Sequence, residues 1–139
     1  MTRGALTVRV LPFVPQPDYD QLLWACDLNF VRGEDSFVRA QWAGQPFIWH
    51  IYPQDKDLHH VKLNAFLQSY SAATPNLRAL SLAWNAAAKD SVDWAALWSA
   101  FAADMPEIAA GSTDWQRRLS ANGDLASNLL KFAEAIKQG

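Results

Sequence analysis

Cysteine, long apolar runs and excess charge are all scarce in this sequence, and each scarcity excludes a class of protein. The single cysteine, Cys26, cannot form an internal disulfide framework and fits a reducing compartment. No apolar run reaches the roughly 18 residues that a membrane-spanning helix requires. The first ten residues lack the apolar core of a signal peptide. We therefore expect a cytoplasmic protein that makes no membrane contact.

Cofactor and metal motifs are missing as well. The net charge of −2 gives no basic surface for nucleic acid. No GxGxxG follows the first apolar segment and no P-loop occurs, which argues against a nicotinamide dehydrogenase. His50 lies inside an apolar run and fits a structural histidine, while the adjacent His59 and His60 do not share a helix face. No cluster has zinc-ligand spacing, so we expect no metal and no cofactor.

What is present is a globular composition with alternating strand and helix patterns. Half of the residues are hydrophobic, which suits one domain with a sizeable core. Period-two alternation and short apolar runs predict strands, and apolar spacings of three and four predict helices. Strands are expected at residues 6–11, 28–31, 46–52 and 77–83. Helices are expected after Asp18, at 36–43, around 63–70, after Asp93 and at 124–137, with Pro106 and Gly111 marking a break.

Strands separated by helices imply right-handed crossovers and a parallel sheet. The expected fold is therefore α/β, a Rossmann-like parallel sheet flanked by helices. It should form a single domain over residues 1–139, with a helical segment at 91–139. Ligands bind such sheets at the carboxyl ends of the strands, which points to the loops at 12–17, 32–36 and 52–60. Because a strand is expected so soon after Met1, the chain resembles a piece of a longer protein.

The stretch Arg32-Gly33-Glu34-Asp35-Ser36 stands where a strand should become a helix. A helix N-terminus offers free N–H groups that favour phosphate. Gly33 permits a close backbone approach and Ser36 adds a hydroxyl, whereas Glu34 and Asp35 suit sugar hydroxyls better than phosphate. Simple helix capping explains the same residues. The five residues alone leave both interpretations open.

A longer pattern extends this stretch. Gly33-x-x-Ser36 is followed by Gly44-x-Pro46 and by an apolar strand that ends in Pro53-Gln54-Asp55. This order resembles the nucleotide-sugar signature in the C-terminal half of two-domain GT-B glycosyltransferases. The resemblance implies the C-terminal, donor-binding half of that fold.

Residues 8–70 resemble one family within that fold, the bacterial protein-arginine rhamnosyltransferases (EarP). Pro12-Phe13, Tyr19-Asp20 and Trp49 to Gln54 carry much of the similarity, together with the Arg32 to Phe37 stretch. The resemblance implies an inverting, metal-independent transfer of rhamnose from dTDP-β-L-rhamnose to an arginine of translation elongation factor P.

The resemblance also implies roles for individual residues. Glu34 would be the catalytic residue with the strongest effect on turnover. Phe13 would stack on thymine, with Gln16 hydrogen-bonding nearby, and Arg32 and Ser36 would hold the diphosphate. The implied donor-binding residues are Phe13, Gln16, Arg32, Gly33, Asp35, Ser36 and Tyr52.

Two further expectations complete this interpretation. The family has an N-terminal acceptor domain whose aspartate acts on the arginine, and that domain is missing here, so the chain alone should bind donor without transferring rhamnose. The alternative is a non-enzymatic doubly wound nucleotide-binding or interaction module, since a fold does not fix a function. Under that alternative, Arg32 makes a surface ion pair and Tyr52 merely closes a strand.

Overall fold

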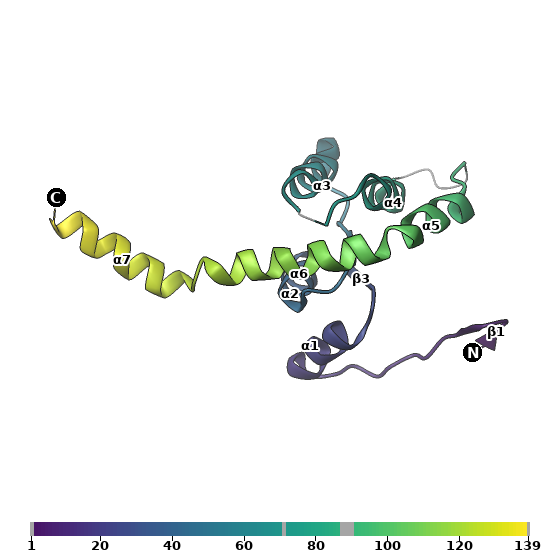
Figure 1. Ribbon diagram of the computed structural model, residues 1–139, viewed down its shortest axis with the longest axis horizontal. Helices are drawn as coiled ribbons and strands as arrows, with labels where there is room; N and C mark the ends of the chain where they lie inside the picture. The colour runs from purple at the N-terminus through teal and green to yellow at the C-terminus, as the bar shows by residue number, and fades with distance from the viewer. Residues whose placement is uncertain (1, 71, 87–90, 139) are drawn as a thin grey trace.

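The computed structural model describes residues 2–70, 72–86 and 91–138. It is an α/β protein, rich in helices and with small sheets (Figure 1). The elements in chain order are β1 (Thr2–Arg3), β2 (Leu6–Thr7), α1 (Gln16–Ala25), β3 (Asn29–Arg32), α2 (Glu34–Ala43), β4 (Phe47–His50), the 3₁₀ turn η1 (Asp55–Asp57), α3 (Leu58–Ser69), α4 (Pro75–Asn85), α5 (Trp94–Ala103), α6 (Met105–Ala121) and α7 (Leu125–Gln138).

The β3–α2–β4 unit confirms the predicted parallel pairing. β3 and β4 run parallel, with Asn29 opposite Phe47 and Arg32 opposite His50. A parallel pair needs a crossover connection, and α2 supplies it. The αL conformation of Gly44, with φ 69° and ψ 11°, ends α2 where the sequence predicted a helix C-terminus. Within the described residues this sheet has two strands, so the larger Rossmann-like sheet is not seen here.

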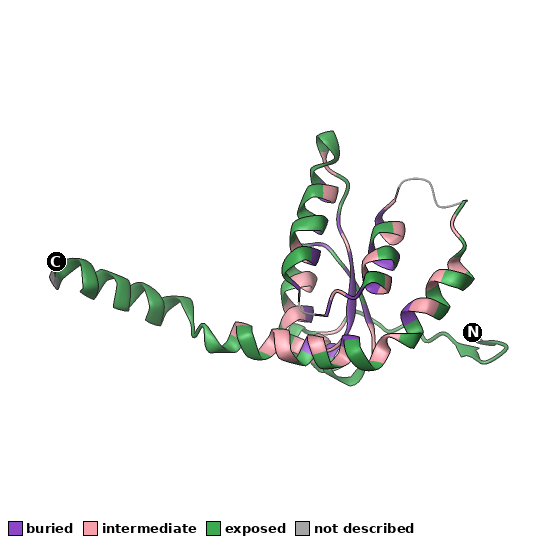
Figure 2. Ribbon diagram, turned by 45° about the horizontal axis from the view of Figure 1, so that its top comes forward, coloured by how far each residue is buried: buried purple, intermediate pink, exposed green. Residues whose placement is uncertain are grey.

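The core lies on β4 and the helices around it, and Figure 2 shows the buried residues gathered on the central strands. Phe47 and Trp49 alternate along β4 and meet aromatic rings from α2 and α3. Phe37 stacks on Trp49 at 3.7 Å between ring centroids, and Phe66 packs edge-on against Phe37 at 4.8 Å. Tyr70 closes the cluster against Phe47 and Phe66. This aromatic cluster packs β4 against α2 and α3.

The predicted strand at residues 6–11 is confirmed only at Leu6 and Thr7. Thr2–Arg3 and Leu6–Thr7 form a short antiparallel hairpin, with Gly4 at φ 59° in its turn. The segment 8–15 that follows has no regular structure, and Val10 and Leu11 are exposed. A strand needs a neighbouring strand to take its backbone hydrogen bonds, and among the described residues β2 pairs with β1 over Leu6 and Thr7 alone.

The predicted strand at residues 77–83 is wrong, because these residues lie in α4. Pro75 occupies the first turn, and the Thr74 hydroxyl accepts a hydrogen bond from the Leu77 N–H at 3.2 Å. Leu77 and Leu80 are buried at helical spacing. A seven-residue apolar segment does not distinguish a strand from a helix by its pattern alone.

The C-terminal helices lie where the sequence predicted helices, but the last of them does not bury its apolar residues as predicted. Asp93 caps α5 as predicted, accepting from the Ala96 N–H at 3.0 Å. The break predicted near Pro106 is present, because α5 ends at Ala103 and α6 begins at Met105, with Pro106 in its first turn where the missing N–H costs nothing. Gly111 lies inside α6 and marks no break. The helix predicted at 124–137 is α7, yet its apolar residues are exposed rather than directed inward, for example Leu125 at 75% and Phe132 at 65%.

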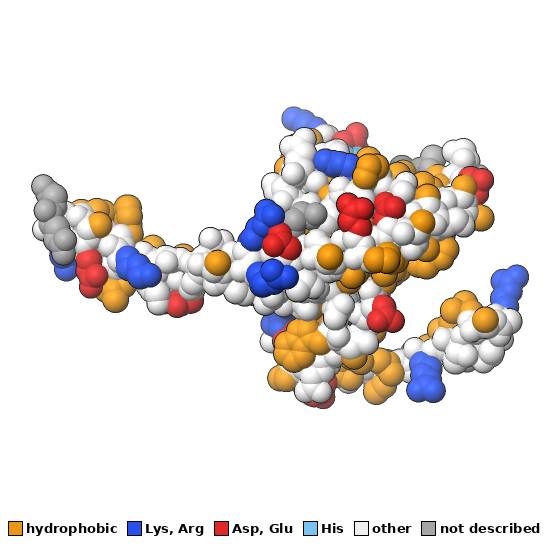
Figure 3. Space-filling view, viewed as in Figure 1, with side chains coloured by type: hydrophobic (Ala, Val, Ile, Leu, Met, Phe, Trp, Pro, Cys, Tyr) orange, Lys and Arg blue, Asp and Glu red, His pale blue; other side chains and the backbone are white. Residues whose placement is uncertain are grey.

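α7 projects from the body as an extension of α6 (Figure 1), and Figure 3 shows apolar side chains open along it. Its N-terminus is well formed, because Asp124 accepts from the N–H and the hydroxyl of Ser127 at 2.9 and 2.7 Å. These hydrogen bonds lower the pKa of Asp124. Across the described part of the chain, no helix has both the length and the apolar character needed to cross a membrane.

The Tyr70 hydroxyl joins the end of α3 to α6, and its ionisation is expected to lower the free energy of unfolding at alkaline pH. It shares a 2.8 Å hydrogen bond with Ser112, and burial raises the pKa of Tyr70 from 10.0 to about 12 although that hydrogen bond opposes the shift. The unfolded chain therefore ionises first, so this contribution is complete below pH 10 and is lost as the pH rises towards 12. The loss should reach about 3 kcal/mol.

Urea unfolding of Tyr70→Phe between pH 9 and 12 should show a smaller fall in stability than the wild type. Ser112 keeps a partner in this variant because its hydroxyl also donates to Ile108 O at 2.8 Å. Tyr52→Phe is the matched control, and it should keep the wild-type fall because Tyr70 remains. Equal pH dependence in Tyr70→Phe and the wild type would contradict the prediction.

Candidate functional site

The strand-to-helix junction at Gly33 is the centre of the candidate site. Gly33 follows β3 directly and is the N-cap residue of α2, with φ 80° and ψ −175°. Its N–H donates to His50 O at 3.2 Å, and its carbonyl accepts from Trp49 Nε1 at 2.9 Å. Both bonds tie the junction to β4. α2 begins at Glu34, two residues before the predicted start.

No side chain caps the N-terminus of α2. The capping interpretation of the two carboxylates and the serine is therefore not what the structure shows. Glu34 and Asp35 are exposed in the first turn, and Ser36 is half-buried. Free N–H groups at a helix N-terminus are a ready site for an anion.

Tyr52 packs directly against this junction. A Cβ placed on Gly33 would lie 2.9 Å from Tyr52 Cε2, so the ring fills the space that glycine leaves open. The Arg32 guanidinium carbon lies 4.7 Å from the centre of the same ring, a cation–π distance. Arg32, Gly33 and Tyr52 are therefore brought together although Tyr52 is 19 residues beyond Gly33.

The end of β4 that leads to Tyr52 is fixed by a buried asparagine. Asn85 on α4 accepts from the Ile51 N–H at 2.9 Å and donates to Trp49 O at 2.8 Å. Its side-chain amide takes the place of a neighbouring strand along this edge of β4. Sequence analysis missed Asn85, because nothing in its local pattern indicates a partner 34 residues away.

A cavity of about 610 Å³ lies between the loop before α1 and the N-terminus of α2. It unites four residues that the sequence predicted, Phe13 and Gln16 from one side and Asp35 and Ser36 from the other. Phe13 is fully exposed at the cavity mouth. The other residues that line the cavity are largely apolar: Leu11, Pro12, Val14, Tyr19 and Leu22. The cavity thus has an apolar wall facing a polar, helix-terminal wall.

The charged residues around the site form contacts that the sequence analysis did not find. Glu34 faces Lys62 of α3, with its Oε1 3.8 Å from Lys62 Nζ. Asp35 pairs with Arg39 one turn further along α2, at 3.2 Å. Arg39 also pairs with Asp20 of α1 at 2.8 Å. The i,i+4 spacing of Asp35 and Arg39 could have revealed the first half of this link, while the pairing with Asp20 depends on how α1 and α2 pack.

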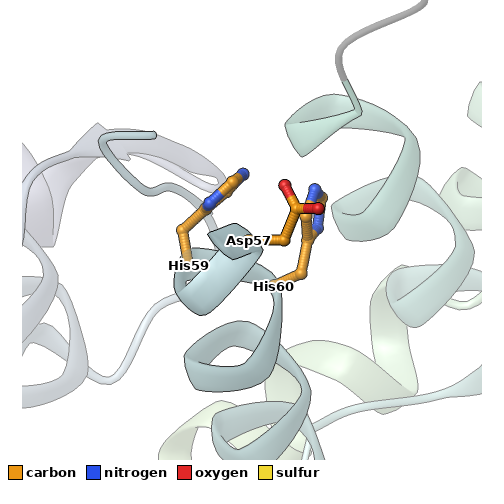
Figure 4. A group of neighbouring side chains, drawn as sticks. All are labelled: Asp57, His59 and His60. Carbon is orange, nitrogen blue, oxygen red and sulfur yellow. The ribbon is translucent and has the colours of Figure 1, made fainter. Parts of the chain in front are cut away.

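Asp57, His59 and His60 form a second polar group at the start of α3 (Figure 4), although the sequence spacing did not indicate it. One ligand atom from each lies within 4.8 Å of the others. His59 Nδ1, however, accepts the Gln54 N–H at 3.3 Å, so Nε2 of a neutral imidazole carries the proton. With His59 engaged, two ligands remain, fewer than the three protein ligands of an open zinc site. The group is therefore better explained by the hydrogen bond through which His59 holds the loop at Gln54 than by a metal centre.

Together, the fold and the site define an α/β protein in which a helix N-terminus without a side-chain cap and a cavity lie where the first of two parallel strands ends. Residues 1–134 match the family model described as Elongation-Factor P (EF-P) rhamnosyltransferase EarP. The chain belongs to the EarP family.

Named relatives and a solved structure agree with this assignment. Protein-arginine rhamnosyltransferases of Pseudomonas aeruginosa and Pseudomonas putida are 49% and 51% identical to the chain, and each match covers 94% of the chain and 35% of the relative. A solved structure from work on EarP-mediated arginine glycosylation of translation elongation factor EF-P is 46% identical, with a TM-score of 0.71 over 96% of this chain and 42% of that one. The chain therefore spans about a third of the length of these curated relatives.

Proposed function

We propose that this chain is the donor-binding domain, residues 1–139, of an inverting protein-arginine rhamnosyltransferase. Rhamnose would pass from dTDP-β-L-rhamnose to an arginine of translation elongation factor P. Family membership and the names of the relatives support the reaction. The observation that carries donor binding is the cavity in which Phe13 and Gln16 face the uncapped N-terminus of α2.

The diphosphate would lie at the start of α2. There the N–H groups of the first turn and the Ser36 hydroxyl supply donors, and the partial positive charge of the helix favours an anion. Arg32, held over Tyr52, would add a full positive charge beside Gly33. These groups could balance the diphosphate charge with no metal ion and no cofactor.

The base and the sugar would lie on opposite sides of the diphosphate. Phe13 is free to stack on thymine because its side chain is fully exposed at the mouth of an apolar wall. Gln16 would hydrogen-bond to the base, and Asp35 to a hydroxyl of the donor. Tyr52 would bind the donor near the base or the diphosphate.

Glu34 is the residue that we assign to catalysis within this chain. Its carboxylate is exposed at the first residue of α2, where it can reach the sugar and the incoming acceptor. An arginine guanidinium stays protonated at neutral pH and is then a poor nucleophile, so it needs a positioned carboxylate. The acceptor-side aspartate would come from the N-terminal domain of the whole enzyme, giving the two-domain GT-B arrangement, with this Rossmann-like half inactive alone. An enzyme that modifies a translation factor would work in the cytoplasm.

Calorimetric titration of the chain with dTDP, UDP and ADP tests this proposal. We expect dTDP to bind selectively, and we expect Arg32→Ala to weaken that binding because it removes the positive charge beside the diphosphate. Lys131→Ala, on α7 away from the site, is the control and should bind as the wild type does. Equal or absent binding of all three nucleotides would refute the donor-site assignment and favour a non-enzymatic nucleotide-binding or interaction module.

A further inference from the structure

Arg39 makes a three-bond link between α1 and α2. Its Nη1 donates to both carboxylate oxygens of Asp20 on α1, at 2.9 and 2.8 Å, and its Nε donates to Asp35 on α2 at 3.2 Å. The side chains of Arg39 and Asp20 are 24% and 29% exposed, so this pair is partly shielded from water. A charge network of this kind differs from an isolated surface pair, whose contribution is small.

The link lies behind the cavity rather than in it. Gln16 lines the cavity, and Asp20 follows it by one turn of α1; Asp35 lines the opposite wall, and Arg39 follows it by one turn of α2. Residues four apart lie on the same helix face. The guanidinium therefore joins the two walls beside the cavity, since Tyr19 and Leu22 on either side of Asp20 line it while Asp20 and Arg39 do not. α1 and α2 are neighbours in Figure 1.

The rest of α1 is anchored at its other end. Asn29 Nδ2 donates to Leu23 O at 3.0 Å, and Gln45 Nε2 donates to Trp24 O at 3.3 Å, both in the last turn. The segment 8–13 before α1 is exposed and has no regular structure. Nearer the start of α1, the hydrogen bonds from Arg39 to Asp20 attach the helix to α2.

The link also has an electrostatic consequence. Asp35 sits at the N-terminus of α2, with its side chain 77% exposed, where its charge would repel a diphosphate. Arg39 offsets that charge and turns the carboxylate along the helix. Arg39 stays ionised, because its hydrogen bond to Asp20 raises its pKa further.

We propose that Arg39, through Asp20, is a positioning residue of the donor site: it fixes the wall that carries Phe13 and Gln16 against the wall that carries Asp35 and Ser36. This inference rests on the proposed function. It concerns residues that touch neither the cavity nor the donor, because Arg39 and Asp20 do not line the cavity.

Calorimetric titration of the chain with dTDP tests this role. Arg39→Met should weaken dTDP binding by about tenfold, equivalent to about 1.4 kcal/mol. Asp20→Asn should weaken it in the same direction although Asp20 is remote from the ligand. Arg118→Met is the matched control, since it breaks an Arg118–Asp114 pair of 2.7 Å on α6, away from the cavity. That control should bind dTDP within about twofold of the wild type.

The double variant distinguishes positioning from a general loss of stability. If Arg39 acts through Asp20, then Arg39→Met/Asp20→Asn should bind dTDP no more weakly than Arg39→Met alone. Titrations are made below the melting temperature of each variant, and if Arg39→Met does not fold, Asp20→Asn carries the test. Wild-type affinity in Asp20→Asn or Arg39→Met, or losses that add in full, would overturn the inference. Failure of the wild type to bind dTDP would instead refute the proposed function.

Discussion

Gly33→Ala is expected to destabilise the chain and to remove dTDP binding. With φ 80° and ψ −175°, Gly33 occupies a backbone region that is essentially restricted to glycine, and an alanine there should cost about 1–3 kcal/mol. The new methyl group would also lie 2.9 Å from Tyr52 Cε2. Tyr52 would have to move, which would release Arg32 from the face of its ring.

Urea unfolding and calorimetry with dTDP together measure both effects of Gly33→Ala. Gly44→Ala is the matched control, because Gly44 also has a positive φ of 69° and a new Cβ there would lie 3.3 Å from Gln116 Cβ. We expect Gly44→Ala to lose stability while keeping dTDP affinity, since Gln116 lies on α6 and does not line the cavity. A Gly33→Ala variant that binds dTDP as the wild type does would show that the junction is not the diphosphate site.

Glu34→Gln should reduce rhamnose transfer by about 100-fold or more in a full-length enzyme that carries this chain, because it removes a carboxylate assigned to the reacting centre. Glu34 is exposed and its Lys62 partner is 3.8 Å away, so neither the fold nor dTDP affinity should change much. The rate is measured as the gain in intact mass of one deoxyhexose on elongation factor P.

Glu107→Gln provides the control for Glu34→Gln, since Glu107 is another exposed acid in the first turn of a helix, α6. It should transfer rhamnose at the wild-type rate. Glu34→Gln with unchanged turnover would contradict the catalytic assignment, and a parallel loss of dTDP binding would make Glu34 a donor-binding residue instead. The 139-residue chain without the rest of the enzyme should give no mass gain.

The sequence by itself determined the local framework of the site. The sequence placed Gly33 at a strand-to-helix junction and Gly44 at a helix end. Both residues have positive φ angles, which glycine adopts readily. The apolar runs of β3 and β4, separated by one helix, were enough to predict a parallel pair. The resemblance over residues 8–70 also indicated the EarP family, to which the chain belongs.

Tertiary structure decided what local patterns leave ambiguous. Residues 77–83 are helical because Leu77 and Leu80 pack into the core from one side of α4, whereas a seven-residue apolar segment suits a strand equally well. The segment 6–11 is not a full strand because strand formation depends on a partner elsewhere in the chain. The apolar residues of α7 are exposed because an amphipathic pattern does not say what lies opposite it.

The same distinction applies within the candidate site. Local sequence placed Arg32 to Ser36 at a helix N-terminus, but it could not place Tyr52 on Gly33 or Asp20 beside Arg39. Those contacts join residues 19 apart in the chain, and their geometry follows from how helices and strands pack rather than from any local spacing. The sequence identified candidate groups at the ends of the strands; the packing of α1, α2 and β4 decided which of them meet.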